Sequence, residues 1–120
     1  MASSDELAAF IASSFRSVWA LELLLLLKEE KRRFSTEDLV TSLRASPAVV
    51  EQGLEALMAA GLADGDGDAF AYMPINPQVA LLVEETEQLY RSRPDRVRRL
   101  IVASSNKGLA AFSDAFRLKD

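Results

Sequence analysis

Histidine and cysteine, the side chains most often used as general base, nucleophile or zinc ligand, do not occur among the 120 residues of this chain. Serine–histidine, cysteine–histidine and zinc chemistries are therefore excluded. The carboxylates, lysines, tyrosines and serines that remain form no recognisable catalytic arrangement. We predict that the protein is not an enzyme and uses no cofactor.

An acidic turn has a spacing that suggests metal binding. Asp64, Asp66 and Asp68 alternate as they do at the start of a calcium loop. The EF-hand pattern then requires glycine at the sixth place and glutamate at the twelfth, where this chain has Ala69 and Ile75. A solvated turn fits this segment better, and we predict no metal site.

Segment 46–62, SPAVVEQGLEALMAAGL, is typical of a helix that Ser46 caps, Pro47 opens and Gly61 ends. At about 100° per residue, this helix has three faces. The face expected to enter the core carries Val50, Leu54, Leu57 and Met58. The outward face carries Ala48, Glu51, Gln52, Glu55 and Ala59. A third face carries Val49, Gly53, Ala56 and Ala60.

Helical spacing also precedes this segment. Apolar residues recur at helical intervals from a capping Ser3 or Ser4 to the leucine run that ends at Leu27. The pattern fits one long helix, and it fits equally two helices joined near Ser13 and Ser14. Both alternatives leave the leucine run as the most apolar helix of the chain.

Further elements are expected on either side of residues 46–62. A capping-box-like start at residues 35–38 opens a short helix. Two Asp-Gly pairs followed by alternating apolar residues indicate a β-hairpin. One helix should follow a capping Asn76, and another should begin at Pro94. A last helix should present Leu109, Phe112 and Phe116.

The stretch STEDLVTSLRASPAVVEQGLEALMAAGLADGDGDAFAYMP, residues 35–74, resembles the DNA-binding core of MarR-type and related winged-helix transcription regulators. The matching features are the STEDL helix start, the Ser-Pro-Ala turn and the spacing Leu54-x-x-Leu57-x-x-x-Gly61-Leu62. The resemblance implies a mainly α fold with a small β-hairpin, a winged helix-turn-helix flanked by N- and C-terminal helices. Its core would span residues 15–75 and a C-terminal helical extension residues 76–120, within a single domain of residues 1–120.

Transcription regulation by DNA binding is the first function that this resemblance implies. Gln52 would contact an adenine edge in the major groove while four cations hold phosphates. Those cations are Lys31, Arg32, Arg33 and Arg44. An ordinary charged surface is the alternative for these residues.

A homodimer is a further implication, because the terminal helices of MarR-type regulators build the dimer interface. In this chain Phe112 and Phe116 would take part in it, and Phe10 and Phe15 also exceed what a small core needs. A tail that folds back onto its own domain is the alternative.

A protein–protein interaction module, an adaptor or modulator that does not read DNA, is the second function. Glu51 and Glu55 have the wrong charge for contact with phosphates, and the expected hairpin tip is acidic too. A protein partner would contact these two glutamates together with Val49 and Gly53. Glycine in mid-helix costs about 1 kcal/mol relative to alanine. The small-residue face would therefore serve close packing within the domain, or a groove for a partner helix.

The net charge of −4 is distributed unevenly. Residues 1–70 hold 6 basic and 12 acidic residues, a net of −6, whereas residues 71–120 hold 8 and 6, a net of +2. The densest basic cluster is RSRPDRVRR, residues 91–99. It is a candidate surface for an acidic partner, with a solvated surface of scattered ion pairs as the alternative.

The apolar run VWALELLLLL, residues 18–27, contains Glu22 and is about half the length of a membrane span. We expect it to be a central helix that is buried nearly all round. Acidic residues near the N-terminus disfavour a secretory signal, and the absence of cysteine suits a reducing interior. We predict a soluble, cytoplasmic protein with no membrane contact.

Overall fold

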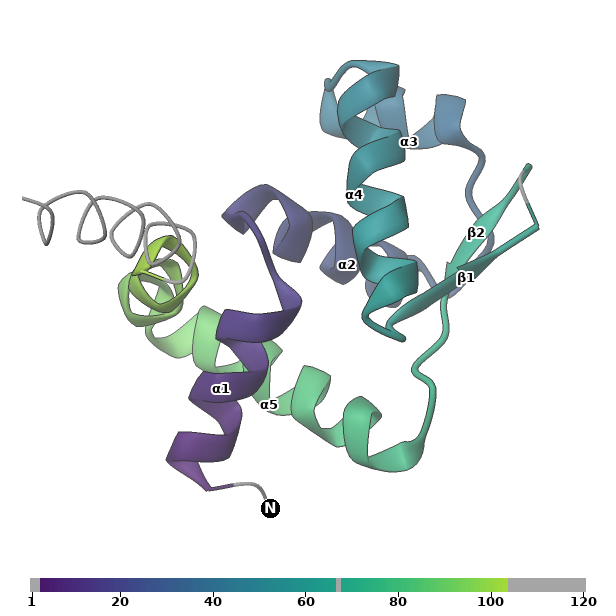
Figure 1. Cartoon of the computed structure of the whole chain (residues 1–120). Helices are drawn as coiled ribbons and strands as arrows, with labels where there is room; N and C mark the ends of the chain where they lie inside the picture. The colour runs from purple at the N-terminus through teal and green to yellow at the C-terminus, as the bar shows by residue number, and fades with distance from the viewer. Residues whose placement is uncertain (1–2, 67, 104–120) are drawn as a thin grey trace, which may run out of the picture.

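The computed structural model of the protein describes residues 3–66 and 68–103, and these are mainly helical with one two-stranded antiparallel hairpin (Figure 1). The expectation of a mainly α fold with a small β-hairpin is therefore confirmed. The elements are, in chain order, α1 (Ser4–Ser14), α2 (Val18–Glu30), α3 (Thr36–Leu43), α4 (Pro47–Ala59), β1 (Ala63–Gly65), β2 (Phe70–Tyr72) and α5 (Pro77–Ser92). Residues 94–103 are also helical.

The N-terminal apolar pattern forms two helices. Ser3 caps α1, Ser17 caps α2, and the extended backbone of Phe15 separates them. The axes of α1 and α2 differ in direction by 101°. In the described part of the chain no single helix is long and apolar enough to cross a membrane. The bent pair of α1 and α2 reaches that length and apolar composition only when the two helices are taken together.

Local hydrogen bonds fix the ends of α3 and the start of α4 where the sequence predicts them. The Ser35 hydroxyl accepts from the Asp38 N–H at 3.0 Å, and the Asp38 carboxylate accepts from the Ser35 N–H at 3.2 Å. This capping box lowers the pKa of Asp38, mainly because the Ser35 backbone N–H donates a hydrogen bond to its carboxylate. Arg44 ends α3 with a left-handed φ of 53°, and Ser46 caps α4.

The hairpin is short, and its tip is held by one carboxylate. Asp66 accepts backbone N–H bonds from Asp68 and Ala69 at 3.0 Å each, and the bond from Ala69 is the main cause that lowers the pKa of Asp66. These contacts form the turn that was predicted for the acidic segment. Phe34, between α2 and α3, exchanges two backbone hydrogen bonds of 2.7 Å with Phe70 of β2.

One hydrophobic cluster includes residues from all the described helices and the hairpin. Five residues of α2 are buried, in keeping with the expected central helix. The members from α1 and the α1–α2 corner, Ile11 and Phe15, belong to the same cluster as Val97 and Ile101. The ring of Phe10 packs edge-on to that of Phe15 at 6.1 Å. The aromatic residues near the N-terminus thus have partners within the chain.

Helices α2 and α4 pack closely where Gly53 of α4 meets α2. A Cβ atom on Gly53 would lie 2.5 Å from the Trp19 ring and 2.9 Å from a Leu23 methyl group. Only glycine allows this approach, so this part of the small-residue face serves packing within the chain.

A largely buried ion pair joins the last turn of α2 to α5. The Lys28 ammonium lies 2.8 Å from a Glu87 carboxylate oxygen and 3.8 Å from Glu84. The side chains of Lys28 and Glu87 are only 19% and 12% exposed. The hydrogen bond to Glu87 raises the pKa of Lys28 above its ordinary value. Nearby, the Tyr90 hydroxyl donates to Glu22 of α2 at 3.3 Å.

Gly53→Ala should lower the free energy of unfolding by about 1–3 kcal/mol, because the new methyl group overlaps the Trp19 ring. Gly53→Leu should cost more and leave part of the protein unfolded. Urea unfolding followed by the fluorescence of Trp19, the chain's single tryptophan, measures both effects. Ala48→Leu on the exposed side of α4 is the control and should change stability by less than about 0.5 kcal/mol. A Gly53→Leu protein as stable as the parent would contradict the packing role.

Lys28→Met should destabilise the protein by about 1–2 kcal/mol, since it takes from Glu87 its closest positive partner in a poorly solvated place. The raised pKa means that this contribution is complete below the unfolded value of 10.5 and is lost only as the pH rises through the folded value. Thermal unfolding at neutral pH is the measurement. Arg91→Met, which removes the exposed partner of the same carboxylate, should cost less than about 0.5 kcal/mol. If both substitutions lowered the stability equally, burial of the Lys28–Glu87 pair would contribute nothing to the stability.

Candidate interaction surface around α4

The outward side of α4 has the composition that the helical wheel predicts. Glu51, Gln52 and Glu55 are exposed there, and we call these three residues the α4 face. Val50, Leu54 and Leu57 point the other way and are buried. Because α4 contains no lysine or arginine, the charge on its outward side is negative.

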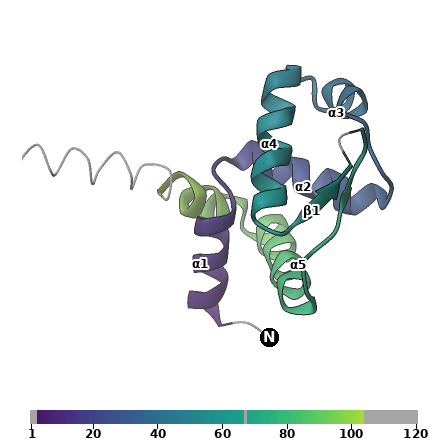
Figure 2. The same cartoon turned by 45° about the vertical axis from the view of Figure 1, so that its right-hand side comes forward.

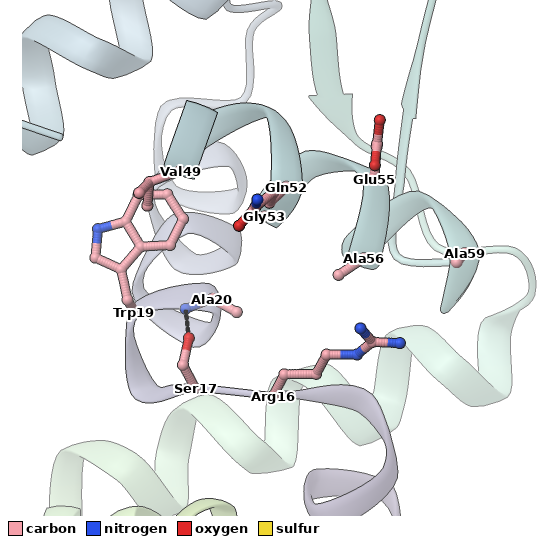
Figure 3. Close-up of a pocket in the computed structure, with 10 residues that line it drawn as sticks. All are labelled: Arg16, Ser17, Trp19, Ala20, Val49, Gln52, Gly53, Glu55, Ala56 and Ala59. Carbon is pink, nitrogen blue, oxygen red and sulfur yellow. Dashed lines mark hydrogen bonds between the residues drawn. The ribbon is translucent and has the colours of Figure 1, made fainter. Parts of the chain in front are cut away.

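A groove separates α4 from the corner between α1 and α2, and we call it the corner groove. It holds about 440 Å³. Its lining residues are Arg16, Ser17, Trp19, Ala20, Val49, Gln52, Gly53, Glu55, Ala56 and Ala59. Trp19 lies beside Val49 at one end, while Arg16 extends toward the end formed by Ala56 and Ala59 (Figure 3). The Trp19 ring occupies the space beside Gly53, so the small-residue face is partly filled from within.

A second groove lies between α4 and the hairpin, and we call it the hairpin groove. It holds about 280 Å³ and includes Leu54, Met58 and Phe70 among its lining. Glu51 and Glu55 line it as well, and both are exposed. This groove therefore combines an apolar floor with two carboxylates at its edge.

Two of the cations expected to hold phosphates are engaged with carboxylates of their own chain. The Arg32 guanidinium stacks over the Phe34 ring at 3.9 Å and lies 3.7 Å from Asp38. Arg33 lies 3.7 Å from Asp66 at the hairpin tip. These contacts reduce the positive potential that either arginine offers to an outside anion.

The other two expected cations are exposed, but they do not lie together. Lys31 ends α2 with a left-handed φ of 52° and lines, with Arg32 and Arg33, a hollow of about 240 Å³ beside Tyr72. Arg44 lies at the opposite end of α3 from this hollow. The structure thus brings Lys31, Arg32 and Arg33 together and leaves Arg44 apart from them.

The basic cluster forms a hollow of its own where α5 gives way to the helix of residues 94–103. The hollow holds about 570 Å³, and its cations are Arg93, Arg96 and Arg99. The two remaining arginines of the cluster have carboxylate partners, at 3.1 Å for Arg91 with Glu87 and 3.5 Å for Arg98 with Asp95.

The predicted partner-binding residues differ in their accessibility. Glu51 and Glu55 are exposed, and Val49 is 42% exposed, whereas Gly53 is buried under Trp19. Phe112 and Phe116 lie outside the described residues. Trp19 was not among the predicted site residues, and no local pattern in the sequence singles it out, because it meets Gly53 only through the packing of α2 against α4.

Comparison of the chain with known protein families, curated proteins and solved structures finds no match in any of the three. The likeness of residues 35–74 to winged-helix regulators therefore remains a resemblance of sequence pattern.

Proposed function

We propose that this chain is a winged-helix protein-interaction module whose α4 face binds a protein partner rather than DNA. It would act as an adaptor or modulator without catalytic activity, in the cytoplasm. The negative charge of the α4 face is the observation that carries the proposal.

Support for the winged-helix part comes from the order and pairing of the elements. Three helices, α2, α3 and α4, are followed by the hairpin, and Phe34 pairs with β2 as a third, one-residue strand would. In winged-helix DNA readers the second helix of the helix-turn-helix lies in the major groove. Here that position corresponds to α4.

Support for a protein partner comes from the charges at the two places where such a protein touches DNA. The α4 face offers Glu51 and Glu55 to a surface that carries one negative charge per about 1.7 Å. The hairpin offers Asp64 from β1 and, at its tip, Asp66 and Asp68; of the three only Asp66 has an ion pair among the described residues. Both contacts would repel a phosphate backbone.

DNA-dependent regulation is the second candidate, and the exposure of three predicted contact residues favours it. Gln52 is exposed on α4, and an amide can pair with an adenine edge. Lys31 and Arg44 are exposed, and neither has a carboxylate within ion-pair distance among the described residues. They could contact phosphates on either side of α3.

Fluorescence anisotropy with a mixed-sequence DNA duplex separates the two candidates. We expect no saturable binding, even at about 50 mM salt, where phosphate attraction is strongest. Binding that weakens by orders of magnitude between about 50 and 200 mM salt would overturn the proposal in favour of DNA-dependent regulation.

Photo-crosslinking in cells tests the protein partnership directly. A photoreactive amino acid at position 52 should give a discrete protein adduct, because this side chain is exposed on the α4 face beside Glu51 and Glu55. Glu51→Lys/Glu55→Lys should abolish the adduct. The control Glu29→Lys/Glu30→Lys makes the same charge change at the exposed end of α2 and should leave it intact. An adduct that survives the α4 reversal would show that another surface makes the contact.

A further inference from the structure

The hairpin groove has the chemistry of a site for an arginine side chain. The apolar floor is formed mainly by the half-buried Met58, together with a small exposed part of Phe70 (8%) and the buried Leu54, and the methylene stem of arginine can lie on it. Glu51 and Glu55 stand at the edge, where carboxylates can receive the guanidinium in a charge-assisted hydrogen bond. A lysine would lack the planar fork that contacts two acceptors at once.

The two glutamates are available for such a contact. Neither Glu51 nor Glu55 has a cation within ion-pair distance among residues 3–66 and 68–103. Arg32 and Arg33, the cations next to the hairpin, form exposed ion pairs of 3.7 Å with Asp38 and Asp66 instead. The two carboxylates of the groove therefore form no ion pair within the described chain.

The basic hollow presents the opposite imbalance. Arg93, Arg96 and Arg99 line it together, and Asp95 is its one acidic residue. The Asp95 carboxylate accepts a hydrogen bond from Arg98 at 3.5 Å, and its carbonyl accepts one from Arg99 at 3.4 Å. Within the described part of the chain, Arg93 and Arg96 have no carboxylate at ion-pair distance.

The two surfaces cannot neutralise each other within one molecule. Figures 1 and 2 both show the helix of residues 94–103 on one side of the fold, and α4 with the hairpin on the other. The complementary surface for each is therefore available on a second copy of the chain.

We propose that copies of this protein associate head to tail, with an arginine of the basic hollow of one copy, Arg93 or Arg96, inserted into the hairpin groove of the next. This inference deepens the proposed function, on which it rests, by naming the partner of the α4 face as the chain itself. The contact joins two different surfaces, so every associated pair keeps one free groove and one free hollow. Association then continues into a ring or an open chain.

Sedimentation velocity of the purified full chain over a range of concentrations tests the association. We expect species larger than a dimer at about 50 mM salt. The association constant should fall at least tenfold at about 500 mM, because the contact depends on exposed charges. A chain that stays monomeric at about 100 μM and low salt would overturn the inference.

Complementary variants test which surfaces meet. Glu51→Gln/Glu55→Gln removes the charge of the groove, and Arg93→Gln/Arg96→Gln removes that of the hollow. Each variant alone should associate at least tenfold more weakly than the parent. Their mixture should form a dimer of one copy of each, because one variant retains the hollow and the other the groove. This dimer cannot grow, since both of its free surfaces are disabled.

Two variants with matched charge changes serve as controls, Glu29→Gln/Glu30→Gln and Lys31→Gln/Arg44→Gln, and both should associate like the parent. Unfolding curves for all four variants establish that each is folded. Association that neither surface variant weakens, as in a symmetric dimer through the terminal helices, would overturn the head-to-tail contact. If the chain is monomeric but the crosslink at position 52 still captures another protein, the self-association fails and the proposed function stands. If both fail, the α4 face binds no protein.

Discussion

The contact between Gly53 and the Trp19 ring determines how close α4 can come to α2, and much of the remaining structure depends on that approach. With α4 held there, Val50, Leu54 and Leu57 enter the core, and Glu51, Gln52 and Glu55 face outward. The ring also fills the space beside the glycine, so a partner helix cannot use that part of α4. Under the proposed function, the outward side and the hairpin groove are the parts of α4 that are left for a partner.

Some acidic and basic residues of this fold form ion pairs with each other, whereas others have no partner of opposite charge among the described residues. Arg32 pairs with Asp38 and Arg33 with Asp66 near α3 and the hairpin, and Lys28 of α2 pairs with Glu87 of α5. Among the charged residues of the described chain that form no ion pair are Glu51 and Glu55 on α4 and Arg93 and Arg96 in the basic hollow. A net charge of −4 conceals this arrangement, since it averages two surfaces of opposite sign.

Much of the fold could be predicted because its signals are local. Ser35, Ser46 and Asn76 cap the helices that follow them, and Gly61 with a φ of 76° ends the helical segment of α4. The outward composition of α4 follows from helical periodicity alone. Contacts between elements could not be predicted in this way. The pairing of Arg33 with Asp66 depends on how the hairpin folds back toward α2, and the close approach of Trp19 depends on the packing of two helices. The ion pair between Arg32 and Asp38 likewise depends on the fold, because the two side chains come from different elements.

Lys31 and Arg44 end their helices in the left-handed region of φ, which is less favourable for a residue with a Cβ atom than for glycine. Their positive charges offset part of this destabilisation, because cations are favoured at the negative C-terminal end of a helix dipole. A substitution at either helix end therefore changes both the stability of the protein and its surface charge. Glycine at either position would relax the backbone while making an already acidic molecule still more negative.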